Sequence, residues 1–477
     1  TKTGTGTFTL SGLSTTTGNF SVNMGTLNLN FGRATASLSG AGAVSNYLPS
    51  AAPMTLGSGI FQLTGRNNGT ATSLTGASWA VNSDIITVAS TAGLAPGQLV
   101  SNANFAAGAY VVSVQSATVF IISAAPTVAG SAATITATTN SFTTSQTFSG
   151  LTLNAGASGV TVTLPASGSD GTVLNLGAIT PNAGATVNFT LPTGTQSATN
   201  GITTDTTNTN GILGGWARVG NQWAVNSTNA AGGNIVALTT YTDVSRLGGT
   251  IASNAGANVR IVEAGASGSI SPTATGTTDI NTLLQSATGG TATYDPGSTD
   301  VLRLGAAGGI MVASNGGALT LGASANDGVL TAGGAAATAG TLYLTNNHAS
   351  NLLTVNSTIT DNGAGVVGVT TSGAGIILLA GTNTYTGQTS VGGGTLRISS
   401  EQNLGSSPLS FAADQLTLAG GTLNTTTSFS IDDSNRGITL AAAGGTISVN
   451  SATTLTVANV ITGTGSLIQS GAGTLAL

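Results

Sequence analysis

Two stretches far apart in the chain carry one pattern, Gly4-Thr-Gly-Thr-Phe8-Thr-Leu10-Ser-Gly12 and Gly373-Ala-Gly-Ile-Ile377-Leu-Leu379-Ala-Gly381. The match continues without a gap to Gly25-Thr-Leu27 and Gly394-Thr-Leu396, at a constant offset of 369 residues (373 minus 4). The last residues, Gly471-Ala-Gly-Thr-Leu475-Ala-Leu477, show the pattern again, so we expect them to occupy the register of Gly4–Leu10. Such self-similarity indicates a repeat architecture.

Short strands with alternating apolar and hydroxyl residues follow one another inside each copy. Examples are Thr395-Leu-Arg-Ile398, Thr446-Ile-Ser-Val449 and Thr454-Leu-Thr-Val457, each bounded by small or polar residues. This period-2 pattern with close spacing predicts an all-β protein, a parallel β-solenoid whose rungs stack along one common axis. An antiparallel sandwich of short hairpins is the alternative, although hairpin dipeptides do not recur regularly.

Residues 78–139 interrupt the repeats and predict a small inserted all-β module. They contain strand-like runs such as Ile85-Ile-Thr-Val88 and Val119-Phe-Ile-Ile122 but no Gly-Thr-Leu unit. The expected organisation is therefore a solenoid start at 1–77, the inserted module at 78–139, a solenoid middle at 140–371 and solenoid repeats at 372–477.

The composition excludes several classes of function. Charged residues make up 5% of the 477-residue chain, with 9 Lys+Arg, 14 Asp+Glu and a net charge of −5. Nine scattered cations cannot form the basic stripe that nucleic acids require. One histidine and no cysteine exclude a zinc cluster and disulfides. No apolar run reaches the length of a membrane-spanning helix, so we expect no such segment.

The boxes Gly381-Thr-Asn383-Thr-Tyr385-Thr-Gly387 and Gly394-Thr-Leu396 resemble the autotransporter-associated β-strand repeat, also called the passenger-associated transport repeat. The resemblance covers 372–477 and, with a degenerate box at Ser14–Gly18, also 1–65. It implies an extracellular or bacterial cell-surface location, a solenoid stalk used for display or adhesion, and no catalytic residues. The inserted module resembles small β modules of bacterial surface and phage-tail proteins.

Few residues of the chain could catalyse a reaction or bind a metal ion. Asp432-Asp433 is the only adjacent acidic pair, and neighbours on a strand point to opposite faces. We therefore expect a polar turn there, with a calcium site as the weaker alternative. His348 is the only residue that could serve as the base of a Ser-His-Asp system, but no signature supports that role. We predict no enzyme activity, no catalytic residue, no cofactor and no metal.

Two functions remain. The first is a structural protein that forms a fibre, stalk or surface layer by end-to-end stacking of solenoid units. Its partners are copies of itself. The residues expected to form the end-to-end contact between copies are Thr1, Lys2, Phe8, Leu10, Leu475 and Leu477. The second is an adhesin that contacts a glycan or a cell surface through the inserted module or through Trp216 and Trp223. For these tryptophans, the alternative to a sugar-stacking platform is packing in the core.

Overall fold

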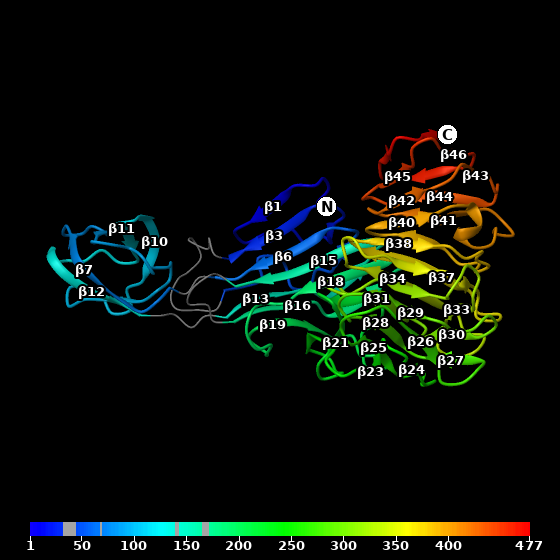
Figure 1. Cartoon of the computed structure of the whole chain (residues 1–477). Helices are drawn as coiled ribbons and strands as arrows, with labels where there is room; N and C mark the ends of the chain where they lie inside the picture. The colour runs from blue at the N-terminus through cyan, green and yellow to red at the C-terminus, as the bar shows by residue number, and fades with distance from the viewer. Residues whose placement is uncertain (32–43, 67–68, 139–142, 165–170) are drawn as a thin grey trace.

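The computed structural model describes residues 1–31, 44–66, 69–138, 143–164 and 171–477. Parallel strands stack into long sheets, which confirms the all-β solenoid. There are two solenoids, however, with separate cores (Figure 1). The described residues include the 3-10 turn η2 (Glu401–Leu404), and none of their helices is long and apolar enough to cross a membrane.

The first solenoid runs from β1 to β22 and has three faces. One face stacks β1, β3, β6, β15, β18 and β20, another β4, β13, β16 and β19, and a third sheet has the order β17-β14-β5-β2. Its strands are β1 (Thr7–Leu10), β2 (Phe20–Val22), β3 (Thr26–Asn30), β4 (Val44–Ser45), β5 (Met54–Leu56), β6 (Ile60–Thr64), β13 (Thr144–Thr147), β14 (Gly150–Leu153), β15 (Gly156–Thr163), β16 (Thr172–Asn175), β17 (Ala178–Pro181), β18 (Ala185–Thr190), β19 (Gly201–Thr204), β20 (Ala217–Val219), β21 (Gln222–Asn226) and β22 (Gly233–Ala237).

The second solenoid also has three faces. Its first sheet has the order β23-β25-β28-β31-β34-β37-β39-β41-β44-β47, with strands Thr242–Ser245, Asn258–Val262, Thr282–Gln285, Gly309–Val312, Gly340–Asn346, Val367–Gly373, Thr389–Val391, Ala412–Leu418, Arg436–Leu440 and Ile461–Gly463. Its second sheet has the order β24-β26-β29-β32-β35-β38-β40-β42-β45-β48, with strands Thr250–Ile251, Gly268–Pro272, Ala292–Tyr294, Leu319–Leu321, Leu353–Val355, Ile376–Leu379, Thr395–Ile398, Thr422–Thr425, Gly445–Val449 and Leu467–Ser470. The third face carries β27 (Thr277–Asp279), β30 (Val301–Leu304), β33 (Val329–Ala332), β36 (Thr358–Ile359), β43 (Phe429–Ile431), β46 (Thr454–Val457) and β49 (Thr474–Ala476).

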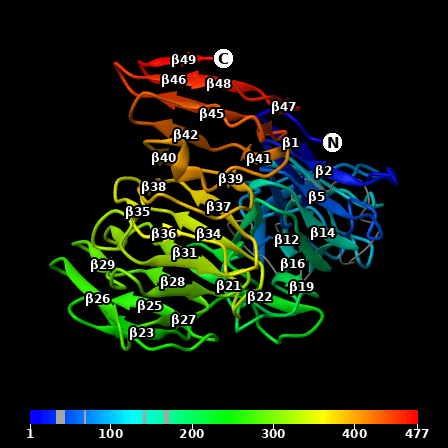
Figure 2. The same cartoon turned by 90° about the vertical axis from the view of Figure 1, so that its right-hand side faces the viewer.

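The chain reverses direction between the two solenoids, so they lie side by side with opposite courses (Figures 1 and 2). Antiparallel pairing of β20 with β21, β21 with β22 and β22 with β19 ends the first solenoid. The expectation of one common axis is therefore wrong, because these hairpins fall within residues 140–371, which we had assigned to a continuous solenoid. The first solenoid also donates backbone bonds to the second, from Ala157 N to Gly392 O (3.2 Å) and from Gly215 N to Ala307 O (2.7 Å).

The offset of 369 residues corresponds to real structural equivalence. Phe8 pairs with Leu27 between β1 and β3, and Ile377 pairs with Leu396 between β38 and β40. The last copy differs, since β49 joins the third face, where Leu475 pairs with Leu455. The expectation that Gly471–Leu477 repeats the register of Gly4–Leu10 is therefore wrong. Similar glycine-rich corners occur at more than one turn of a rung, so the pattern alone does not identify the face.

The Asn-Thr-Tyr-Thr-Gly box stabilises a corner of a rung. Asn383 Oδ1 accepts a bond from Ile359 N (2.8 Å), and its Nδ2 donates to Asn403 O (2.6 Å). Tyr385 is fully buried and its hydroxyl bonds Thr389 Oγ1 at 2.6 Å. Because Asn383 bonds the rungs before and after its own and these buried polar atoms are satisfied, the box acts in folding.

The inserted module is an antiparallel barrel between β6 and β13. Its sheet order is β10-β11-β8-β7-β12-β9, and a bridge between Leu99 and Tyr110 joins its two edges. Strand β7 begins at Thr72, so residues 72–77, which we had assigned to the solenoid, belong to the barrel; the other boundary, at 139, lies outside the described residues. The strands are β7 (Thr72–Trp79), β8 (Ile85–Thr87), β9 (Val100–Ser101), β10 (Val111–Ser116), β11 (Val119–Ile122) and β12 (Gly130–Ala137).

Candidate functional site

The barrel stands away from both solenoids (Figure 1). Both of its connections to the first solenoid are at one end of the β7–β12 pair, where Thr72 lies opposite Ala137. At the other end Trp79 lies opposite Gly130. An eight-residue strand spans about 25 Å, so the loops beyond Trp79 are held well away from the connections. We call Ala80–Ile85 together with Thr127–Ala129 the barrel tip.

The barrel tip exposes aliphatic side chains that would ordinarily be covered. Val81, Ile85 and Val128 are 52%, 51% and 54% exposed, respectively. Below them Trp79 is only 5% exposed and contacts the ring of Phe105 at a centroid distance of 4.9 Å. The tip is thus an apolar surface that rests on the buried Trp79 and the partly buried Phe105.

Asp84 is the only charged residue between positions 69 and 138. Its side chain is exposed, and in the parts of the chain that the structure describes no hydrogen bond or ion pair engages its carboxylate. The barrel tip therefore combines one free negative charge with aliphatic groups.

Trp216 and Trp223 lie inside the molecule. Trp216 is 4% exposed and packs in the first core, while Trp223 is fully buried with Leu284 and Met311 of the second solenoid. The interpretation as a sugar-stacking platform is wrong, because neither indole face is open to a ligand. The alternative of core packing is confirmed, and the two rings help to close the junction between the solenoids.

Asp432 and His348 do not join a cluster of ligands. Asp433 Oδ1 accepts a bond from Asn435 N (3.1 Å), as expected for a polar turn. His348 Nδ1 accepts bonds from Ser350 N (3.0 Å) and Asn351 N (2.8 Å), so the ring holds a turn. Among the described residues, no group of three or more His, Cys, Asp or Glu side chains could hold a metal ion.

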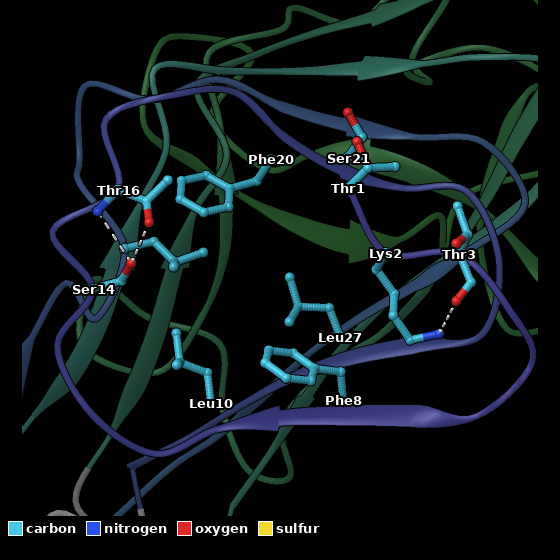
Figure 3. A pocket seen from close by; sticks show the side chains of 11 residues that line it. Thr1, Lys2, Thr3, Phe8, Leu10, Ser14, Thr16, Phe20, Ser21 and Leu27 are labelled. Carbon is cyan, nitrogen blue, oxygen red and sulfur yellow. Dashed lines mark hydrogen bonds between the residues drawn. The ribbon is translucent and has the colours of Figure 1, made fainter.

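Four of the predicted end-to-end contact residues line a cavity of about 450 Å³ at the first rung: Thr1, Lys2, Phe8 and Leu10 (Figure 3). Lys2 Nζ donates to Gly4 O (2.6 Å) and Met24 O (3.2 Å), and Phe8 is 55% exposed. Leu475 and Leu477 lie in the last rung, and Leu477 is 75% exposed. Both rungs lie at the same end of the molecule, because the chain reverses between the solenoids (Figures 1 and 2).

The sequence predicts the inserted module but not its exposed tip. Val81 and Ile85 look like ordinary strand residues, and the loop near Val128 carries no motif. The one sequence feature that points to the tip is that residues 69–138 carry no charged side chain except Asp84.

Comparison with known proteins gives one partial match. Over 103 residues the chain is 40% identical to "Adhesin BmaC autotransporter" from Brucella suis biovar 1 (strain 1330). The match covers 22% of this chain and 3% of that protein. No protein-family model and no solved structure matches the chain. A part of the chain is thus similar to an autotransporter adhesin, of whose length this chain spans only a small part.

Proposed function

We propose that this protein is an extracellular or cell-surface adhesin in which paired β-solenoids hold the barrel for contact with another surface. The position of the barrel carries the proposal: it is joined to the scaffold at one end only and exposes an apolar tip at the other. Contiguous exposed apolar patches commonly mark interaction sites. The partial similarity to an autotransporter adhesin supports the same role.

Attachment of coated beads to an animal-cell layer tests this proposal. One set of beads carries the whole chain, and the other carries a variant in which residues 70–138 are replaced by a short Gly-Ser linker. We expect the variant to lose attachment while its circular dichroism keeps the β-solenoid signal. Equal attachment by both proteins would contradict the proposal.

The second candidate is association of copies through their first and last rungs. In the second solenoid, the last rung ends on the third face with β49. In the first solenoid, Lys2 pairs with Val22 of β2. By the offset of 369 residues, β2 is equivalent to β39, which lies on the first face of the second solenoid. A coil that leaves the third face enters the first face next, so the last rung of one copy can stack on the first rung of another in phase. This is β-augmentation between copies.

Because both rungs lie at one end of the molecule, we expect a closed pair of copies instead of an open filament. Sedimentation of the whole chain should show a dimer that the double variant Phe8→Asp, Leu475→Asp converts to a monomer. A monodisperse monomer of the unmodified chain at high concentration would contradict this second proposal.

A further inference from the structure

The barrel tip is held rigidly although it is exposed. Asn82 N donates to Pro126 O (2.8 Å), Trp79 Nε1 to Val128 O (2.9 Å) and Ile122 N to Asp84 O (2.9 Å). The first bond joins the loop after β7 to the loop before β12, the second joins β7 to that same loop, and the third joins the end of β11 to the loop after β7. A Cβ atom on Gly130 would lie 2.2 Å from Trp79 Cζ2, so glycine is needed for the indole to lie flat below the tip. Rigid surfaces lose little conformational entropy on binding, which favours affinity.

The chemistry of the tip disfavours several partners. The barrel carries no cation for phosphate groups, which disfavours nucleic acids and anionic membranes. Trp79 is buried and the tip has no aromatic residue, so sugar rings lack a stacking surface. Two copies of the tip would bring two Asp84 carboxylates together, which disfavours self-association. An aliphatic surface with one free carboxylate is complementary to aliphatic groups around a cation.

We propose that the barrel tip docks onto a protein surface on which aliphatic side chains surround a lysine or arginine. Val81, Ile85 and Val128 supply apolar contact, and Asp84 pairs with the cation and sets the orientation. This inference rests on the proposed function, because it assigns the adhesive contact of the barrel to one end of it.

Binding of the whole chain to immobilised probes tests the inference. The probes are a random lysine–leucine copolymer, a glutamate–leucine copolymer, dextran, and phosphatidylserine/phosphatidylcholine vesicles. We expect binding to the lysine–leucine copolymer in preference to the other three. Asp84→Asn should weaken it about two- to fivefold, as for an exposed ion pair. The double variant Val81→Ser, Val128→Ser should weaken it about tenfold or more.

Matched variants control for net charge and for exposed apolar area. Asp432→Asn removes an exposed carboxylate on the second solenoid, and Leu99→Ser removes a partly exposed leucine near the barrel's connections. Neither should change the binding. Equal weakening by Asp432→Asn, or a preference for dextran, vesicles or the glutamate copolymer, would overturn the inference.

The bead assay separates this inference from the proposed function. If the tip variants attach to cells like the unmodified chain while replacement of residues 70–138 abolishes attachment, the barrel adheres through another face. The inference about the tip is then wrong and the proposed function stands.

Discussion

Gly373 shows how a single residue permits one rung to follow the next. Its φ is +96°, and a Cβ atom there would lie 2.1 Å from Asn346 O in the rung below. Gly373→Ala should therefore lower the urea midpoint of the second solenoid, with a backbone cost of about 1–3 kcal/mol in addition to the clash. The matched control is Gly12→Ala. At Gly12 no heavy atom lies within 4 Å of the position of a Cβ atom, and φ is outside the left-handed region. Equal midpoints for the two variants would show that this corner adapts.

At the scale of the element, stacked aliphatic side chains stabilise the second solenoid. Leu353, Ile377, Leu396, Leu423 and Ile447 pair successively along the second sheet, and each is at most 1% exposed. Leu396→Ala should lower the free energy of unfolding by about 2–5 kcal/mol, because it leaves a cavity between two rungs that cannot collapse into it. Leu378→Ala, on the outward side of the neighbouring strand, should cost far less. Unfolding in urea measures both, and similar losses would contradict the ladder as the source of stability.

The sequence predicted these ladders because each strand carries its own period-2 pattern and each repeat aligns with the next. For the reversal between the solenoids the sequence offers one signal, the Gly-Asn dipeptide at 220–221, while β20 and β21 otherwise look like any other short strands. What distinguishes them is antiparallel pairing across the Gly220-Asn221 turn. The barrel tip was missed for a similar reason: only the closure of the barrel shows which loops lie far from its connections.

At the scale of the whole molecule, close backbone packing holds the two solenoids together. A Cβ atom on Gly215 would lie 2.9 Å from Ala307 O of the second solenoid. Gly215→Val should therefore force the solenoids apart and increase the radius of gyration in X-ray scattering. Gly256→Val, where a Cβ atom would meet only Asn254 Oδ1 at 3.6 Å, should leave the radius unchanged. An unchanged radius for Gly215→Val, with the fold intact, would show that the interface repacks.

Buried phenols predict how the stability of the molecule depends on pH. Burial raises the pKa of Tyr294, Tyr343 and Tyr385 from 10.0 to about 12. In the unfolded chain these phenols ionise near pH 10, whereas the folded protein keeps their protons up to about pH 12. Their contribution to stability is therefore complete below pH 10 and is lost as the pH rises through 12.

We therefore expect the urea midpoint to fall steeply between about pH 10 and pH 12, in parallel with phenolate absorbance. Tyr385→Phe should make this fall shallower, although it also removes the bond to Thr389 and so lowers the midpoint at neutral pH. The carboxylates should matter less in acid: Arg260 lowers the pKa of Asp243, but that side chain is 43% exposed and screened by water. A midpoint that is constant from neutral pH to about pH 11 would mean that the phenols ionise inside the fold, and hence that the rungs open locally to solvent without unfolding.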